Sequence, residues 1–124
     1  MPDGAADPAC GAVASQWPAA VSGREPVAVT PESPAVRAWG DPAIVARCGV
    51  ATPGPSTDSC ISVNGVDWLA TPLTDGTRFV TYGRSPALEV LIPAASSGSA
   101  AEGSLLPVFT AAAQALPETG RHCS

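Results

Sequence analysis

The chain has 124 residues and a formal net charge of −5, and all six of its basic residues other than histidine are arginines. A chain of this length forms one domain, and an acidic chain without a basic run is poorly suited to binding nucleic acid or an anionic membrane surface. Its hydrophobic fraction of 45% includes many alanines, which bury little area, so we expect a small core that needs covalent stabilisation. No apolar stretch approaches the roughly 18 residues of a membrane span.

The N-terminal segment predicts a short disordered tail, residues 1–7, followed by a single domain over residues 8–123. Asp7 is a good N-cap residue and Pro8 suits the first position of a helix. Over residues 8–17 the side chains that fall on one helical face are those of Cys10, Val13, Ala14 and Trp17. We therefore expect an amphipathic helix that presents Cys10 and Trp17 to the core.

The middle of the chain alternates strand-like runs with turn signals. Runs rich in apolar, β-branched and aromatic residues occupy residues 27–29, 36–39, 43–50, 60–63, 66–69, 77–83 and 87–92. Asn64-Gly65 is a strong hairpin signal, and a second hairpin is predicted around Ser85-Pro86, with Phe79 opposite Ile92 on its core face. We expect four to five of these runs to form one antiparallel sheet.

The C-terminal part begins with residues 94–103, an Ala-, Ser- and Gly-rich run that is typical of a linker loop. Ser104 can cap a second helix that ends at Pro117, with an apolar stripe of Leu105, Val108, Phe109, Ala112 and Leu116. Because the helices do not alternate with the strands, the predicted fold is α+β: an antiparallel sheet of four to five strands with two helices packed on one face.

The chain has an even set of cysteines without a close Cys-x-x-Cys pair, namely Cys10, Cys48, Cys60 and Cys123. With a single histidine, His122, this pattern favours two disulfides over a metal site, and we expect neither a metal nor a cofactor. Three connectivities are possible. We favour Cys48–Cys60, which would close a hairpin between residues 43–50 and 60–63, together with Cys10–Cys123, which would tie the two chain ends together.

Disulfides persist in oxidising compartments, so the expected location is extracytoplasmic, either secreted or tethered to the membrane. The N-terminal residues do not form a signal peptide. We therefore expect that a leader or membrane anchor preceded Met1 in the precursor, and that this anchor is the protein's only contact with the membrane.

Several groups of residues resemble a known family. They are Ala38-Trp39-Gly40-Asp41-Pro42, Arg47-Cys48-Gly49-Val50, Val63-Asn64-Gly65-Val66-Asp67-Trp68 and Thr81-Tyr82-Gly83-Arg84-Ser85-Pro86. In this order, and with the matching cysteines, they resemble the actinobacterial family catalogued as domain of unknown function 3515, over roughly residues 10–123. Members of that family look like extracytoplasmic domains that follow one hydrophobic segment, which implies a place in the cell envelope. The resemblance implies no reaction and no catalytic residues.

The sequence contains no pattern that predicts a catalytic set. His122 is interpreted as a tail residue beside a cysteine. The acidic candidates for an acid–base pair are Asp41, Asp58, Asp67, Asp75 and Glu89; Asp41, Asp58 and Asp75 fall in turns or loops, and Asp67 falls on a short strand. The candidate ligand-binding residues lie in the family-like motifs: Trp39, Arg47, Trp68, Tyr82 and Arg84. Arginine beside aromatic rings can stack or hold a carboxylate or phosphate. The alternative is that Arg84 pairs with an acid such as Glu89 or Asp67, that Arg47 lies along the sheet, and that the tryptophans fill the core.

These features favour a non-catalytic binding or accessory module of the cell envelope, whose partner is an envelope protein or a small ligand. Two alternatives stay open. Loop 51–59, stiffened by Pro53 and Pro55, would serve a secreted inhibitor-like module. A hydrolase or transferase of the envelope would need a cleft with titratable groups in hydrogen-bond reach of one another.

Overall fold

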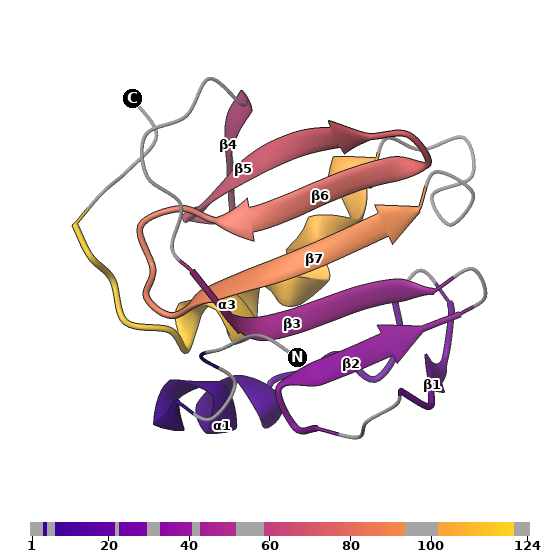
Figure 1. The fold of residues 1–124 in the computed structure, drawn as a ribbon, viewed down its shortest axis with the longest axis horizontal. Coiled ribbons are helices and arrows are strands. Elements are labelled where there is room, and N and C mark those ends of the chain that lie inside the picture. The colour runs from indigo at the N-terminus through magenta and orange to yellow at the C-terminus, as the bar shows by residue number, and fades with distance from the viewer. Residues whose placement is uncertain are drawn as a thin grey trace.

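The computed structural model describes residues 4, 7–21, 23–29, 33–40, 43–51, 59–93 and 102–120. Two α-helices and one 3₁₀ helix flank the strands in the sequence: α1 (Pro8–Ala14), η1 (Glu102–Phe109) and α3 (Thr110–Gln114). The strands are β1 (Pro26–Val27), β2 (Val36–Trp39), β3 (Ile44–Val50), β4 (Ser59–Val63), β5 (Val66–Leu73), β6 (Gly76–Thr81) and β7 (Ala87–Pro93). The chain is therefore an α+β domain, as predicted (Figure 1).

The strands form one antiparallel sheet in the order β1-β2-β3-β7-β6-β5-β4. Each strand from β1 to β3, and each from β4 to β7, pairs with its neighbour in the sequence, so the sheet consists of two meanders. The pairing of β3 with β7 joins them. The sheet has seven strands rather than the four to five predicted, because even the two-residue strand β1 pairs at its edge.

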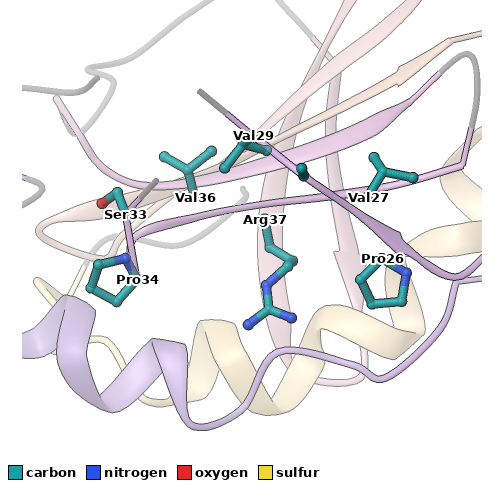
Figure 2. A pocket seen from close by; sticks show the side chains of 8 residues that line it. Pro26, Val27, Val29, Ser33, Pro34, Val36 and Arg37 are labelled. Atoms are coloured by element: carbon teal, nitrogen blue, oxygen red, sulfur yellow. The ribbon is translucent and has the colours of Figure 1, made fainter. Parts of the chain in front are cut away.

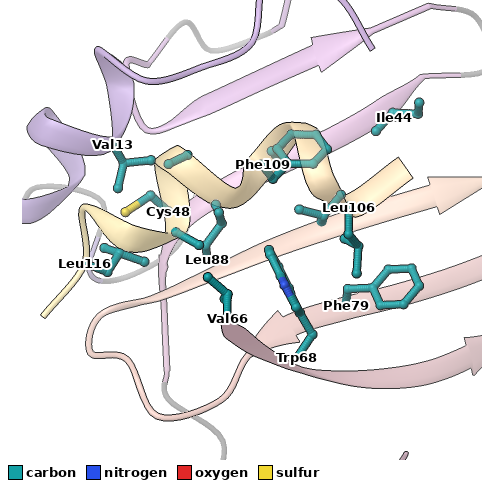
Figure 3. Packing of buried hydrophobic residues seen from close by; sticks show 14 of the residues in the cluster. Val13, Ile44, Cys48, Val66, Trp68, Phe79, Leu88, Leu106, Phe109 and Leu116 are labelled. Atoms are coloured by element: carbon teal, nitrogen blue, oxygen red, sulfur yellow. The ribbon is translucent and has the colours of Figure 1, made fainter. Parts of the chain in front are cut away.

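The helices pack on one face of the sheet, and the core lies between them and the strands (Figures 1 and 3). Alternate residues of each strand point to this face, as the pleat requires. On the helix side, η1 contributes Leu106 and Phe109, α1 contributes Val13, and Leu116 follows the end of α3. The largest side chains buried here from the strands are those of Trp39, Trp68, Ile44, Leu88 and Ile92. The sequence prediction that helices cover one face is confirmed.

Two local signals were read correctly. The carboxylate of Asp7 accepts a hydrogen bond of 2.9 Å from the Ala9 N–H and caps α1. Asn64 and Gly65, with φ values of 52° and 85°, form the turn between β4 and β5, where Val63 pairs with Val66. The first helix ends at Ala14, earlier than predicted, because Ser15 adopts its C-cap and Pro18 follows closely.

The C-terminal helical region differs from its prediction. Its first part is a 3₁₀ helix, with Pro107 inside it, and only Thr110–Gln114 is α-helical. A 3₁₀ turn has about three residues, so the buried face shifts relative to an α-helix. Leu106 is consequently fully buried, whereas Val108, which was placed on the apolar stripe, is 42% exposed.

The predicted cysteine pairing is wrong. Cys10 of α1 is bonded to Cys48 of β3, with Cα atoms 5.6 Å apart, so neither Cys48–Cys60 nor Cys10–Cys123 can form. Cys48 points to the helix-covered face, whereas Cys60 pairs with Leu69, whose row continues to Val80 and Glu89 on the opposite face. Cys60 carries no free thiol, and Cys123 lies outside the described residues.

The hairpin predicted between residues 43–50 and 60–63 is also wrong, because β3 pairs with β2 and β7 while β4 pairs with β5. In the second predicted hairpin the faces are right, but the register differs by two residues: Phe79 lies opposite Val90 rather than Ile92. Most of tail 1–7, of loop 51–59 and of linker 94–103 lies outside the described residues, as do Asp41, Asp58 and His122.

Candidate functional site

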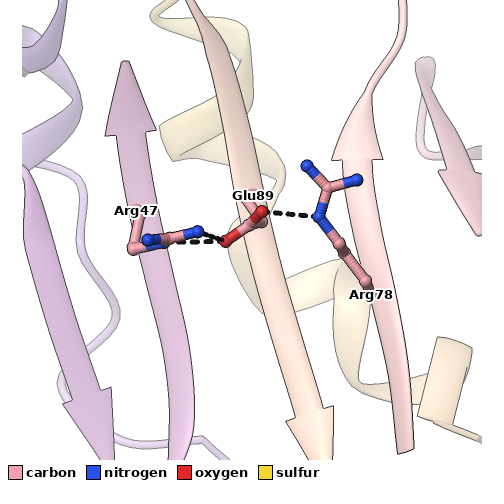
Figure 4. A network of polar contacts seen from close by, with 3 residues as sticks. All are labelled: Arg47, Arg78 and Glu89. Atoms are coloured by element: carbon pink, nitrogen blue, oxygen red, sulfur yellow. Dashed lines mark hydrogen bonds and ion pairs between the residues drawn. The ribbon is translucent and has the colours of Figure 1, made fainter. Parts of the chain in front are cut away.

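A buried carboxylate on the helix-free face of the sheet lies between two arginines from the neighbouring strands. Glu89 of β7 accepts a hydrogen bond of 2.7 Å from Nε of Arg47 on β3, and Nη2 of Arg47 contacts the same oxygen, Oε1. On the other side, Nε of Arg78 on β6 donates to Oε2 over 2.6 Å. Figure 4 shows the carboxylate bridging the two guanidinium groups across three strands. We call these three residues the Arg–Glu–Arg cluster.

The strand register explains why these side chains meet. Arg47 lies directly opposite Glu89 in the β3–β7 pair, so both point to the same face. Arg78 lies opposite Leu91 and reaches Glu89 diagonally, one pleat away on the same face. Long side chains span such diagonal distances of about 7–8 Å. Alternation alone therefore places one acid and two bases in a row on the surface opposite the core.

The exposure of the three side chains is uneven. Glu89 is only 2% exposed, whereas the Arg47 and Arg78 side chains are 35% and 40% exposed. A buried carboxylate is stable only when its oxygens are paired and hydrogen-bonded, which both arginines ensure here. Two bases share one acid, so the cluster carries a net positive charge on a protein of net charge −5.

Both arginines keep N–H donors that Glu89 does not use. Arg78 contacts Glu89 only through Nε, and in Figure 4 its two terminal nitrogens point away from the carboxylate. Neither arginine contacts another acid among the described residues. A guanidinium presents its donors in a fixed fork that matches carboxylate and phosphate oxygens. The cluster can therefore accept an anionic group from outside without losing its bonds to Glu89.

Two of the predicted ligand-binding residues lie elsewhere, in the core. Trp39 is fully buried: its ring packs edge-on against Trp17 and Phe109, and its Nε1 donates to the Pro18 carbonyl over 3.1 Å. Trp68 is 1% exposed and points to the helices. Both rings thus lie on the face opposite Arg47.

Arg84 and Tyr82 follow strand β6. Arg84 is 8% exposed, and its Nη1 donates to the carbonyls of Leu116 (2.8 Å) and Gln114 (3.4 Å) at the end of α3. Its Nη2 lies 3.3 Å from Glu118. Tyr82 is half-buried and its backbone N–H donates to the Asp67 carbonyl over 2.8 Å. The structure therefore does not gather the five predicted residues at one place.

Sequence reasoning found Arg47 but missed the role of its partners, Glu89 and Arg78. A signal was present, since Glu89 is the only charged residue in the apolar run of β7. A charge inside such a run indicates a paired or functional group. Among the residues that the structure describes, no group of histidines, cysteines or acids is placed to hold a metal ion, and no helix is long and apolar enough to cross a membrane.

The fold and the cluster together define a small disulfide-bonded α+β domain, in which one sheet face is covered by helices and the other carries paired charges. The chain belongs to the family described as "Protein of unknown function (DUF3515)", whose model matches residues 2–119. No curated protein and no solved structure matches the chain.

Proposed function

We propose that this protein is a non-catalytic binding or accessory module that works outside the cytoplasm, in the envelope or in secreted form, and that it binds a partner through a carboxylate or phosphate group. The observation that carries the proposal is the Arg–Glu–Arg cluster. Two half-exposed guanidinium groups are held in fixed positions by one buried acid. Such preorganisation lowers the entropy lost when an anion binds.

The charge balance supports an anionic partner. An acidic protein repels anions over most of its surface, so a localised cationic pair gives the encounter both an orientation and a location. Tyr82, four residues after Arg78 along the chain, falls on the same face by the strand alternation and extends the proposed contact surface. Trp39, Trp68 and Arg84 contribute to this proposal by holding the sheet and α3 in place rather than by touching the partner.

The proposed location rests on the cysteines. The Cys10–Cys48 disulfide is compatible with an extracellular environment, and a tether to the membrane through a segment outside this chain is part of the proposal. The inhibitor-like alternative involves loop 51–59, most of which lies outside the described residues.

A titration with a short glutamate peptide and with inorganic phosphate, followed by amide chemical shifts, tests the function. We expect shifts at Arg47, Arg78 and their neighbours that weaken as salt is raised. The decisive variant replaces the whole cluster by apolar residues, with Arg47→Met, Arg78→Met and Glu89→Leu. Arg24→Gln is the matched control, because Arg24 lies away from the cluster beside Gly40. If the apolar variant binds either probe as well as the parent, the proposal is wrong.

A further inference from the structure

A second disulfide follows from the structure by elimination. Cys60 of β4 is disulfide-bonded, and Cys10 and Cys48 are bonded to each other. The sequence contains only one further cysteine, Cys123. Within one chain Cys60 therefore has a single possible partner, and its bond joins the penultimate residue of the chain to an edge strand of the sheet.

The two disulfides differ in their surroundings. Cys10 and Cys48 lie in the hydrophobic core between α1 and the sheet, and they are 2% and 0% exposed. Cys60 is half-buried on β4, and it points to the face that the helices leave uncovered, since its row continues through Leu69 to Val80. Thiol–disulfide exchange requires an external thiolate to reach a sulfur atom. The core therefore protects the Cys10–Cys48 bond, whereas Cys60 lies where a thiolate can approach.

The two edges of the sheet also differ. At the β1 edge, a pocket with a volume of about 510 Å³ lies beside β1 and β2, and no cysteine lines it (Figure 2). Its arginine, Arg37, lies on the opposite side of the strands from Val27 and Val36. At the β4 edge Cys60 supplies a sulfur atom. Among the described residues, thiol chemistry at a sheet edge is therefore confined to β4.

The segments that the second disulfide joins are also held without it. β4 pairs with β5 along its whole length. The chain after α3 is attached to the turn between β6 and β7, because the Thr119 N–H donates to the Gly83 carbonyl over 2.8 Å and the Ser85 N–H donates to the Pro117 carbonyl over 3.1 Å. Opening the bond should therefore detach only the residues after Thr119 from β4, while the sheet stays folded.

We propose that the Cys60–Cys123 bond is a site of reversible thiol–disulfide exchange with an external dithiol, and that the Cys10–Cys48 bond is not. In the first step a thiolate of the dithiol attacks Sγ of Cys60, forms a mixed disulfide and releases Cys123 as a thiolate. The second thiol of the dithiol then attacks the mixed disulfide, closes a disulfide within the dithiol and releases Cys60. The dithiol gives up two electrons and two protons, and the protein gains two thiols.

The exchange would control where the end of the chain is attached. Cys60 belongs to the same row of the helix-free face as Glu89 and Arg47. The closed bond therefore holds Cys123 at the edge of the face that carries the Arg–Glu–Arg cluster, and reduction detaches it without changing the charges of the cluster. Exchange does not require the cluster to bind a partner, so this proposal and the proposed function can each fail alone.

Graded reduction of the oxidised full chain, followed by alkylation and peptide mass spectrometry, tests the proposal. At dithiothreitol concentrations that leave the circular dichroism spectrum native, we expect Cys60 and Cys123 to be labelled at least about tenfold faster than Cys10 and Cys48. Removal of the reductant and reoxidation in air should restore a protein that takes up no label. In urea that unfolds the chain the difference in rate should disappear, because burial in the core is what protects the first bond.

The matched control is Cys60→Ser combined with Cys123→Ser, which keeps the protected bond and removes the exchangeable one. It should take up no label under the same native conditions, and the labelling of the parent decides the test if this variant does not fold. Cleavage of the oxidised parent after arginine should join residues 48–78 to residues 122–124. The inference is overturned if this crosslink is absent, if all four cysteines of the folded parent are labelled at one rate, or if none is labelled before the chain unfolds.

Discussion

Arg78 and Glu89 form an ion pair across neighbouring strands although they do not lie opposite each other, since Val80 faces Glu89 and Leu91 faces Arg78. If the pairing moved by two residues so that Phe79 faced Ile92, Tyr82 would lie opposite Glu89, and Arg78 would lie two pleats away from its carboxylate. The apolar residues would keep their faces, so the ion pair distinguishes the observed register from this one, which the core alone does not.

The cluster provides the first prediction, on stability. Replacing both arginines by methionine leaves the Glu89 carboxylate buried without a partner, and we expect the free energy of unfolding to fall by about 3–5 kcal/mol. Adding Glu89→Leu to that variant should return stability to within about 1 kcal/mol of the parent or above it, because a packed apolar triad avoids the desolvation of charge. Urea unfolding of the three proteins measures both steps. Equal stability of the double and triple variants would contradict a buried ionised Glu89.

The second prediction concerns the disulfide. Cleavage after arginine without reductant should release residues 1–24 and residues 48–78 in one crosslinked species, joined through Cys10 and Cys48. Mass spectrometry detects this directly, and a species that joins residues 1–24 to residues 122–124 without residues 48–78 would contradict the structure. The loop between the two cysteines spans a sequence separation of 38, for which chain entropy gives a contribution of about 4 kcal/mol. The variant Cys10→Ala with Cys48→Ala should lose that amount, and alkylation of the oxidised parent should label no cysteine.

The third prediction concerns Arg84, which donates to the carbonyls of Gln114 and Leu116 and to Glu118. Arg84→Met removes charge-assisted bonds to buried carbonyls, and we expect a loss of about 1.5–3 kcal/mol in urea unfolding. Glu118 is 63% exposed, so Glu118→Gln should cost less than about 1 kcal/mol. A larger loss from Glu118→Gln than from Arg84→Met would reverse this assignment. Once folded, Arg84→Met should bind the glutamate peptide like the parent.

A fourth prediction follows from the contact between Trp39 and Phe109, whose ring centroids lie 5.4 Å apart at an angle of 73°. Edge-to-face pairs are worth about 0.5–1.5 kcal/mol beyond the area they bury. A double-mutant cycle with Trp39→Leu and Phe109→Leu should return a coupling energy in that range. Val80, on the other face, serves as the control, because Val80→Ala combined with Phe109→Leu should be additive.

A fifth prediction compares two glycines at which an added Cβ meets no other atom within 4 Å. Gly65 has φ of +85° in the β4–β5 turn, so Gly65→Ala should destabilise by about 1 kcal/mol through backbone strain alone. Gly11 is inside α1, so Gly11→Ala should stabilise by about 0.5–1 kcal/mol. Thermal unfolding of both variants measures this difference in sign. A stabilising Gly65→Ala would be inconsistent with the left-handed turn.

Local signals in the sequence were sufficient for much of the fold. The N-cap at Asp7, the Asn64-Gly65 turn and the alternation around Phe79 and Val90 each depend on residues close together in the chain, and each was read correctly. The pairing of β3 with β7 could not be predicted from such local signals. It connects distant segments, and nothing in residues 44–50 distinguishes β7 from β4 as a neighbour.

The site was predictable only in part for the same reason. Arg47 was singled out from its motif, but its partner Glu89 lies on a strand that was not expected beside it. The tryptophans were weighed both as ligand platforms and as core residues, and burial places both Trp39 and Trp68 in the interior. The cysteine pairing failed because opposite faces of a pleated sheet separate Cys48 from Cys60, which sequence spacing does not report.

The seam between β3 and β7 has a consequence for the order in which the molecule assembles. Each meander is built from hydrogen bonds between consecutive strands, whereas the seam must close a much longer loop, which is slower and entropically more demanding. During synthesis, β1, β2 and β3 are therefore made before β7, and the edge of β3 that pairs with β7 stays unpaired until β7 has been made. The Arg47–Glu89 ion pair can form only when β7 pairs with β3, so it belongs to the last step in the assembly of the sheet.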